Sequence, residues 1–178
     1  TFSVGWYDNA WTYRQKITID STKVANTDQI NFPVYVDLED LGTGLFENAK
    51  SDGSDIVITG PDGTTKLSRE VVDIDTVSET GELWFKSPLL QPDFDNIYYI
   101  YYGNTSASES NDTSVWSNGY ELVQHMNEDP SGSAPQMLDS TSYSNDGTSQ
   151  GTMTTGDLVA GKVGTAIQFD NSNDAIQI

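Results

Sequence analysis

The sequence predicts an all-β fold: an antiparallel β-sandwich or jelly roll with a short second β unit. Short runs of β-branched and aromatic residues recur along the chain, and clusters of Gly, Pro, Asn and Asp separate them. Several runs alternate apolar and polar residues with a period of two, which is typical of half-buried strands. Aromatic residues make up 11% of a chain that is only 35% hydrophobic, so we expect a thin, aromatic-rich core.

The clearest strands lie at 83–86 and 97–102, on either side of a turn at 91–96. Pro92 restricts φ, and the Asp and Asn side chains of the turn bond to nearby backbone groups. The second run is apolar or aromatic on both faces, since Tyr98, Ile100 and Tyr102 alternate with other large residues. A strand of this kind is expected in the middle of a sandwich, with neighbours on both sides.

Other elements follow in order along the first part of the chain. We expect strands at 11–19, 32–38, 55–59 and 66–75, a short helical turn within 41–50, and a β-turn at 60–63. Residues expected to face inward on the first strand are Trp11, Tyr13, Ile17 and Ile19. Pro33 favours an edge strand or a strand start, because proline has no N–H for the ladder.

A domain boundary is predicted near residue 118. Residues 105–118 are rich in Ser, Asn, Thr and Asp, so we divide the chain into a β-sandwich domain at 1–118 and a second β unit at 119–178. The second unit is expected to contain strands at 120–126, 163–169 and 175–178, with a long polar stretch at 127–151.

Charge and composition restrict the function. The formal net charge is −19, which disfavours nucleic acids and anionic membranes as partners. The absence of Cys excludes disulfides and Cys-based metal sites, and no apolar run is long enough to span a membrane. The start at Thr1, with no basic n-region, is interpreted as that of a mature or excised product whose signal peptide is absent. Two triplets, at Asn104 and Asn111, match the N-glycosylation pattern.

Spaced motifs in the first domain resemble a prokaryotic domain of unknown function found on secreted and surface proteins. These motifs are Trp11…Tyr13-Arg14…Ile17…Ile19-Asp20, Asn31-Phe32-Pro33-Val34, Asp55-Ile56 with Asp62-Gly63, Leu83-Trp84 and Tyr101-Tyr102-Gly103-Asn104. The second unit is similar to the opening part of a concanavalin-A-like (laminin-G-like) lectin domain. That likeness rests on His125-Met126-Asn127-Glu128, Asp139-Ser140-Thr141, Asn145-Asp146-Gly147 and residues 161–174. It implies a sandwich or jelly-roll fold, and the first resemblance implies no established activity.

Candidate sites are few. His125 and Glu128 have no further His or Cys to complete a zinc site, so we assign His125 a structural role. No pair of acids stands out for glycoside hydrolysis, and the large aromatic residues are interpreted mainly as core. Calcium is the expected cofactor if a metal binds, because it takes carboxylate, amide and carbonyl oxygens from loops. Its predicted ligands are Asp139, Asp146, Asp170 and Asp174, with Asp52 and Asp55 as a further cluster; the competing interpretation is that these acids stabilise turns.

The second unit offers few strands, so its apolar residues need cover from the first domain, from another chain or from further sequence. We therefore expect a non-catalytic cell-surface protein with a structural or adhesive role. Its expected partners are other protein chains, including copies of the same chain. Such copies would join by strand addition through the C-terminal strands and could form a filament. The alternative is a lectin-like module that binds glycans with calcium. A hydrolase is a more distant third.

Overall fold

The computed structural model describes residues 4–178, and the expectation about the chain start at Thr1 lies outside them. The structure divides into two compact units, Thr1–Asn118 (unit 1) and Gly119–Ile178 (unit 2). The predicted all-β fold is confirmed, because antiparallel sheets dominate the structure and helices are short. Each unit is described by itself.

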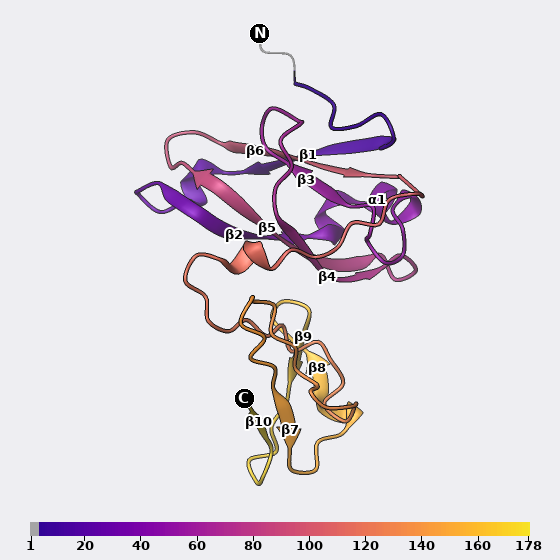
Figure 1. Ribbon diagram of the computed structural model, residues 1–178, viewed down its shortest axis with the longest axis vertical. Coiled ribbons are helices and arrows are strands. Elements are labelled where there is room, and N and C mark those ends of the chain that lie inside the picture. Colours follow the sequence, from indigo (N-terminus) through magenta and orange to yellow (C-terminus); the bar gives the residue numbers. More distant parts are fainter. Residues whose placement is uncertain (1–3) are drawn as a thin grey trace. The chain divides into compact units, whose positions relative to one another are not determined.

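The first sheet of unit 1 has the strand order β1-β6-β3, with β1 at Tyr13–Ile19, β6 at Asn96–Tyr102 and β3 at Val57–Thr59. Both pairings are antiparallel. Strand β6 therefore lies in the centre of this sheet (Figure 1). One face of β6 belongs to one hydrophobic cluster and the other face to a second, as its apolar residues on both faces predict.

The second sheet has the order β2-β5-β4, formed by Gln29–Asp37, Thr80–Leu90 and Arg69–Asp75. A register shift interrupts the β4–β5 pairing between Val71 and Asp73. Strand β2 carries Pro33 and lies at an edge, as predicted from the missing N–H of proline. Strands β5 and β6 are consecutive in sequence but belong to opposite sheets, so residues 91–95 connect the two layers (Figure 1).

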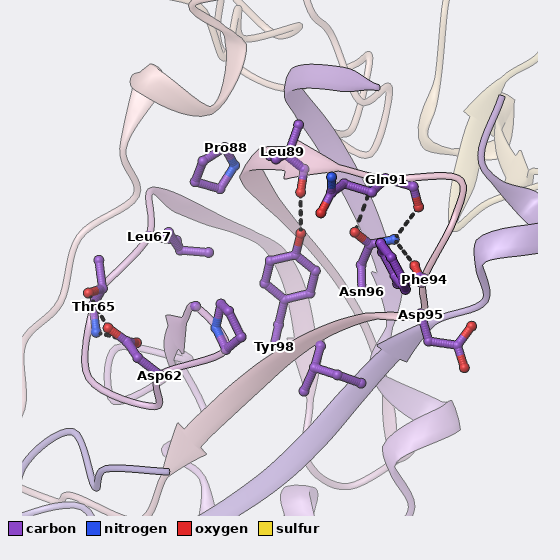
Figure 2. Close-up of a pocket in the computed structure, with 13 residues that line it drawn as sticks. Asp62, Thr65, Leu67, Pro88, Leu89, Gln91, Phe94, Asp95, Asn96 and Tyr98 are labelled. Atoms are coloured by element: carbon purple, nitrogen blue, oxygen red, sulfur yellow. Dashed lines mark hydrogen bonds between the residues drawn. The ribbon is translucent and has the colours of Figure 1, made fainter. Parts of the chain in front are cut away.

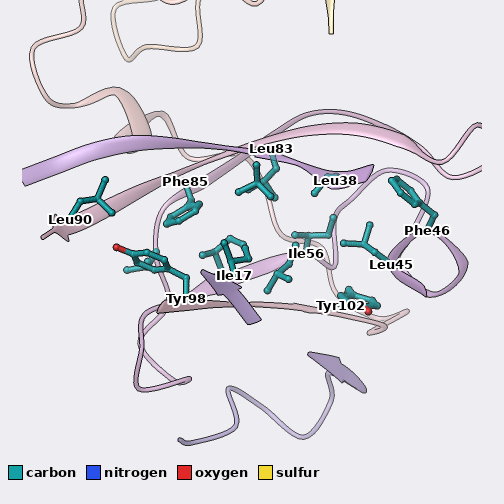
Figure 3. Close-up of a cluster of buried hydrophobic side chains, with 14 residues drawn as sticks. Ile17, Leu38, Leu45, Phe46, Ile56, Leu83, Phe85, Leu90, Tyr98 and Tyr102 are labelled. Atoms are coloured by element: carbon teal, nitrogen blue, oxygen red, sulfur yellow. The ribbon is translucent and has the colours of Figure 1, made fainter. Parts of the chain in front are cut away.

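Side chains from both sheets meet in one core between the layers (Figure 3). Phe85 of β5 packs against Tyr98 of β6, with the ring centroids 4.8 Å apart. The fully enclosed apolar members of this core are Leu38, Leu45, Ile56, Ile58, Leu83, Phe85 and Ile100. Burial of these side chains provides the main free energy that holds the sandwich together.

Short helices close the ends of unit 1. The 3₁₀ helices are η1 (Ser21–Lys23), η2 (Leu38–Leu41) and η3 (Thr113–Trp116), and the α-helix α1 spans Thr43–Asn48. The helix α1 lies within the predicted helical segment 41–50 and buries Leu45 and Phe46 in the core. The described residues contain no helix with the length and hydrophobicity needed to cross a membrane.

Unit 2 has shorter elements. Strand β7 (Thr148–Gln150) pairs with β10 (Ala175–Gln177), and β8 (Leu158–Ala160) pairs with β9 (Thr165–Ile167), both antiparallel. The 3₁₀ helix η4 (Thr155–Asp157) precedes β8 and has a capping box formed by Thr154 and Asp157.

One strand prediction in unit 2 is wrong, and a second is longer than the strand that the structure contains. Residues 120–126 form no strand, because the backbone there bonds to other groups: Val123 N donates to Asp139 Oδ1, and Val123 O accepts from Ser140 N. The predicted strand 163–169 is reduced to β9, since the Gly161 N–H donates to Gly164 O and closes a hairpin turn. Strand β7 was not predicted, and it lies in the stretch expected to be loop.

One prediction in unit 1 is also wrong. Tyr13 was expected to face inward but is 41% exposed, and its ring stacks on Tyr102 of the neighbouring strand at 5.5 Å. Trp11 is buried as expected, although it precedes β1.

Candidate functional site

A concave pocket of about 460 Å³ lies in unit 1, in the size range of small-ligand sites. The turn after β3 forms one wall, and the connection from β5 to β6 forms another (Figure 2). The lining residues that matter for its chemistry are Asp62, Leu67, Leu89, Gln91, Phe94, Asp95 and Tyr98.

The floor of the pocket is apolar and fixed. Tyr98 and Leu67 are buried members of the core, so the pocket opens directly above the sandwich interior. The Tyr98 hydroxyl donates to Leu89 O (3.2 Å) and shares a 2.5 Å hydrogen bond with Ser87 Oγ. Burial raises the pKa of Tyr98, and the Ser87 contact only partly offsets this, so the hydroxyl stays neutral.

An exposed aromatic ring stands at the rim. Phe94 is 67% exposed although it belongs to a well-organised loop. The Asn96 carboxamide organises this loop: its Oδ1 accepts from Gln91 N (2.9 Å), and its Nδ2 donates to Gln91 O (3.0 Å) and Phe94 O (3.1 Å). These bonds fix the backbone of the loop that carries the exposed Phe94 ring.

Two carboxylates flank the floor, with Asp62 and Asp95 on opposite sides of the Tyr98 ring (Figure 2). Asp62 accepts from Thr65 Oγ1 (2.5 Å), Thr65 N (2.9 Å) and Thr64 N (3.0 Å), and these bonds lower its pKa to about 2. Asp95 Oδ1 accepts from Ser21 N (3.0 Å). Asp62 is thus ionised at neutral pH and carries a negative charge at this side of the pocket.

A second, polar hollow of about 350 Å³ adjoins Arg69, but its groups already serve the fold. The Arg69 guanidinium is buried and donates to Ile56 O, Asn111 Oδ1, Glu109 O and Gly53 O. Asn111 also bonds Val71 through both side-chain polar atoms, so a glycan on this predicted sequon asparagine would break that contact.

The motifs that carry the family resemblance meet around Asp55, which is fully buried. Its carboxylate accepts from Lys50 N (2.9 Å), Gly103 N (2.7 Å) and Asn104 N (3.2 Å). The Trp11 indole donates to Asp55 O at 2.5 Å. Gly103 has φ 85°, and a side chain there would collide with the Tyr13 ring. These contacts give the motif residues a role in folding.

Arg14 forms a second contact within the same motifs. Its guanidinium lies 4.8 Å from the ring centroids of both Trp6 and Tyr99. It also donates to Gly5 O (2.8 Å), which holds the N-terminal segment on the outer face of the first sheet. Cation–π contacts with these two rings therefore hold the Arg14 guanidinium in place.

The predicted calcium ligands Asp139 and Asp146 are brought together. Asp139 N donates to Asp146 Oδ1 (2.8 Å), and the Asp139 carboxylate accepts from the N–H groups of Val123 (3.0 Å), Thr141 (2.9 Å) and Asn145 (2.9 Å). Burial raises the pKa of Asp139, but these bonds outweigh it and the pKa is lowered. The acids therefore already have a turn-stabilising function.

Asp170 and Asp174 also lie together, in the turn before β10. Asp170 N donates to Asp174 Oδ2 (3.0 Å), and Asp170 Oδ1 accepts from Ser172 N (2.7 Å). Within residues 4–178 no three His, Cys, Asp or Glu side chains cluster as a metal site would require. Calcium is also ligated by amide and carbonyl oxygens, and calcium binding by the four acids stays a prediction.

Glu128, the partner considered for His125, has one oxygen engaged: its Oε1 accepts from Leu138 N at 3.1 Å. Its Oε2 is buried without a hydrogen-bond partner. The structural role assigned to His125 stays a prediction.

The pocket itself was missed from the sequence. The turns at 60–63 and 91–96 were each predicted, but only the sheet order places them around one hollow. An exposed Phe between two acids in a turn, Asp93-Phe94-Asp95, was the available signal.

Comparison with known families gives one match. Residues 52–134 match the model of a family described as a Domain of unknown function (DUF2341). No curated protein matches the chain. No solved structure matches it either. The match supports the expected likeness of unit 1 to a domain of unknown function and extends into the first part of unit 2, whereas the lectin likeness of unit 2 stays a prediction.

Proposed function

We propose that this is a non-catalytic, extracellular β-protein with a structural or adhesive role, which assembles with other protein chains through unit 2. Copies of the same chain are the first candidates as partners, joined by strand addition at the C-terminal strands. In this proposal unit 1 is a stable folded domain, and unit 2 makes the contact with the other protein chains.

The observation that carries the proposal is the poor core of unit 2. Of the buried hydrophobic side chains among the described residues, only Met137 and Met153 belong to it. Its exposed large hydrophobic side chains are Tyr120, Leu122, Leu138, Tyr143, Val163, Phe169 and Ile178. A unit with this balance exposes apolar surface that a second protein would remove from water.

The strands of unit 2 provide the means of contact. Strands β7 to β10 are three residues long, and in the described structure each has a single strand partner. Each two-stranded sheet therefore has open edges, and open edges accept strands from other chains. Two-stranded sheets are marginally stable alone, so a third strand would also stabilise the unit.

Other features support a non-catalytic surface protein. Asp62 in the pocket is held as an ionised turn residue, which leaves it unsuited to general acid catalysis. The net charge of −19 favours a well-hydrated protein at the cell surface.

Sedimentation velocity over a wide range of chain concentrations tests the proposal, and electron microscopy then identifies filaments. We expect oligomers to grow with concentration, and the double substitution Phe169→Ser with Ile178→Ser to shift the onset at least tenfold higher. Val77→Ser is the matched control, because Val77 is 91% exposed but lies in unit 1. A strict monomer at millimolar concentration would contradict self-assembly.

The carbohydrate-binding alternative has one supporting observation, the exposed Phe94 ring at a preformed pocket. All four Trp residues are packed against another aromatic ring, and the Arg14 guanidinium also lies over the Trp6 ring. A glycan array with and without EDTA tests this alternative; specific binding that EDTA weakens would favour it over the structural role.

A further inference from the structure

We propose that the pocket between Asp62 and Asp95 is a binding site for an arginine side chain of a partner protein. This inference rests on the proposed adhesive function, and it names the chemistry of the partner that unit 1 takes.

The charge of the pocket has one sign. Two of its lining residues, Asp62 and Asp95, are acidic, and the lining includes no Lys, Arg or His. The bonds from Thr64 and Thr65 keep Asp62 ionised well below neutral pH. Asp95 uses Oδ1 for Ser21 N, and its second oxygen has no hydrogen bond to a described group. A cation is therefore the complementary ligand, in a protein whose net charge is −19.

The shape of the pocket selects a cation with an apolar, flat body. The floor between the acids is formed by Leu67 and Tyr98, and Leu89 and Phe94 stand at the rim with 40% and 67% of their surface exposed (Figure 2). An arginine stem can cover this floor while its planar guanidinium stacks on the Phe94 ring. The same guanidinium can donate to a carboxylate, and such charge-assisted bonds are the stronger kind.

The protein already holds one arginine against aromatic rings. The Arg14 guanidinium lies 4.8 Å from the centroid of the Trp6 ring and 4.8 Å from that of the Tyr99 ring, and it donates to Gly5 O. The pocket offers an exposed aromatic ring beside two acidic side chains, and its lining contains no arginine. An external arginine would complete it.

A pair of peptides tests the inference. The probes are acetyl-Gly-Arg-Gly-amide and the same peptide with citrulline, which keeps the shape of arginine but has no charge. Binding is followed by amide chemical shifts of Gln91, Phe94 and Asn96 at a chain concentration low enough for a monomer. We expect the arginine peptide to shift these signals with millimolar affinity and the citrulline peptide to bind at least tenfold more weakly.

Variants locate the contact. Asp95→Asn keeps an oxygen for Ser21 N but removes the charge, and Phe94→Ala removes a mostly exposed ring; each is expected to weaken peptide binding about five- to tenfold. Asp93→Asn is the matched control, since Asp93 lies in the same loop but does not line the pocket. Retained amide dispersion shows that each variant is folded.

Equal binding of the two peptides, no shift with either peptide, or pocket shifts caused only by neutral sugars would overturn the proposal. The last of these results would assign the pocket to a glycan. Because the measurement uses the monomer, its failure leaves self-assembly through unit 2 intact, and a failure of self-assembly leaves the peptide result intact.

Discussion

Units 1 and 2 differ most in how much apolar surface each encloses. Unit 1 places two three-stranded sheets face to face around a continuous core. Unit 2 has two two-stranded sheets, and its buried hydrophobic side chains among the described residues are two methionines. Side-chain-to-backbone hydrogen bonds can therefore organise a unit that has only a small apolar core, as Asp139 does by accepting from three backbone N–H groups.

The largest effect is expected from opening the core of unit 1. Phe85→Ala removes a fully buried ring that packs on Tyr98, and we expect it to lower the free energy of unfolding by about 3–5 kcal/mol. Denaturant unfolding followed by Trp fluorescence measures this, because all four Trp residues lie in unit 1. Phe94→Ala is the control, and a comparable loss there would contradict the assignment of the core.

The second-largest loss in the free energy of unfolding is expected when the buried carboxylate of Asp55 is removed. Asp55→Ala leaves the N–H groups of Lys50, Gly103 and Asn104 without their acceptor, and we expect a loss of about 3 kcal/mol in the same unfolding experiment. Asp52→Ala removes one acceptor in a neighbouring exposed turn and should cost far less. Similar losses for both would show that Asp55 is not the organising residue of the motifs.

In unit 2, the substitution Met137→Ala is expected to have a smaller effect on stability than the substitutions in unit 1. Met137 is fully buried, but with few apolar neighbours we expect a loss of about 2 kcal/mol, at the low end for Met→Ala. The substitution should broaden or shift amide signals of residues 119–178 while Trp fluorescence of unit 1 is unchanged. A simultaneous change in the Trp signal would mean that the two units unfold together.

The smallest expected effect is a dependence of the stability of unit 2 on pH. The pKa of Asp139 is lowered in the folded chain, so its ionised form stabilises unit 2 above the unfolded pKa of about 4, and this contribution is lost as pH falls through the folded pKa. Amide shifts of Val123, Thr141 and Asn145 followed from pH 6 to pH 2 should report the loss. In Asp139→Asn this pH dependence should disappear; its persistence would assign the titration to another group.

Much of unit 1 could be predicted because the local sequence pattern of each strand indicates where the strand lies. The run at 97–102 is apolar on both faces, and both faces of β6 are packed in hydrophobic clusters. Pro33 lacks an N–H for the ladder, and the strand that carries it, β2, lies at an edge. Sheet order could not be predicted, since it depends on pairings distant in sequence, such as Ile17 with Tyr98. The pocket depends on that order, so it was missed although both of its turns were expected.

The strands of unit 2 were harder to predict from the sequence, for a physical reason. Its strands are three residues long, too short for a period of two to be visible, and Val123 gives its N–H to a side chain instead of a ladder. The proximity of Asp139 to Asp146, and of Asp170 to Asp174, did follow from their spacing in turn-rich sequence. Their predicted calcium ligation is still to be measured.

The most direct test of the account is amide hydrogen exchange of the intact chain at low and at high concentration. We expect protection in residues 119–178 to rise with concentration, because association covers an apolar surface that unit 2 leaves exposed, while protection of the unit 1 strands stays the same. Concentration-independent protection in unit 2, as strong as that of β5 and β6, would contradict the claim that this unit needs a partner.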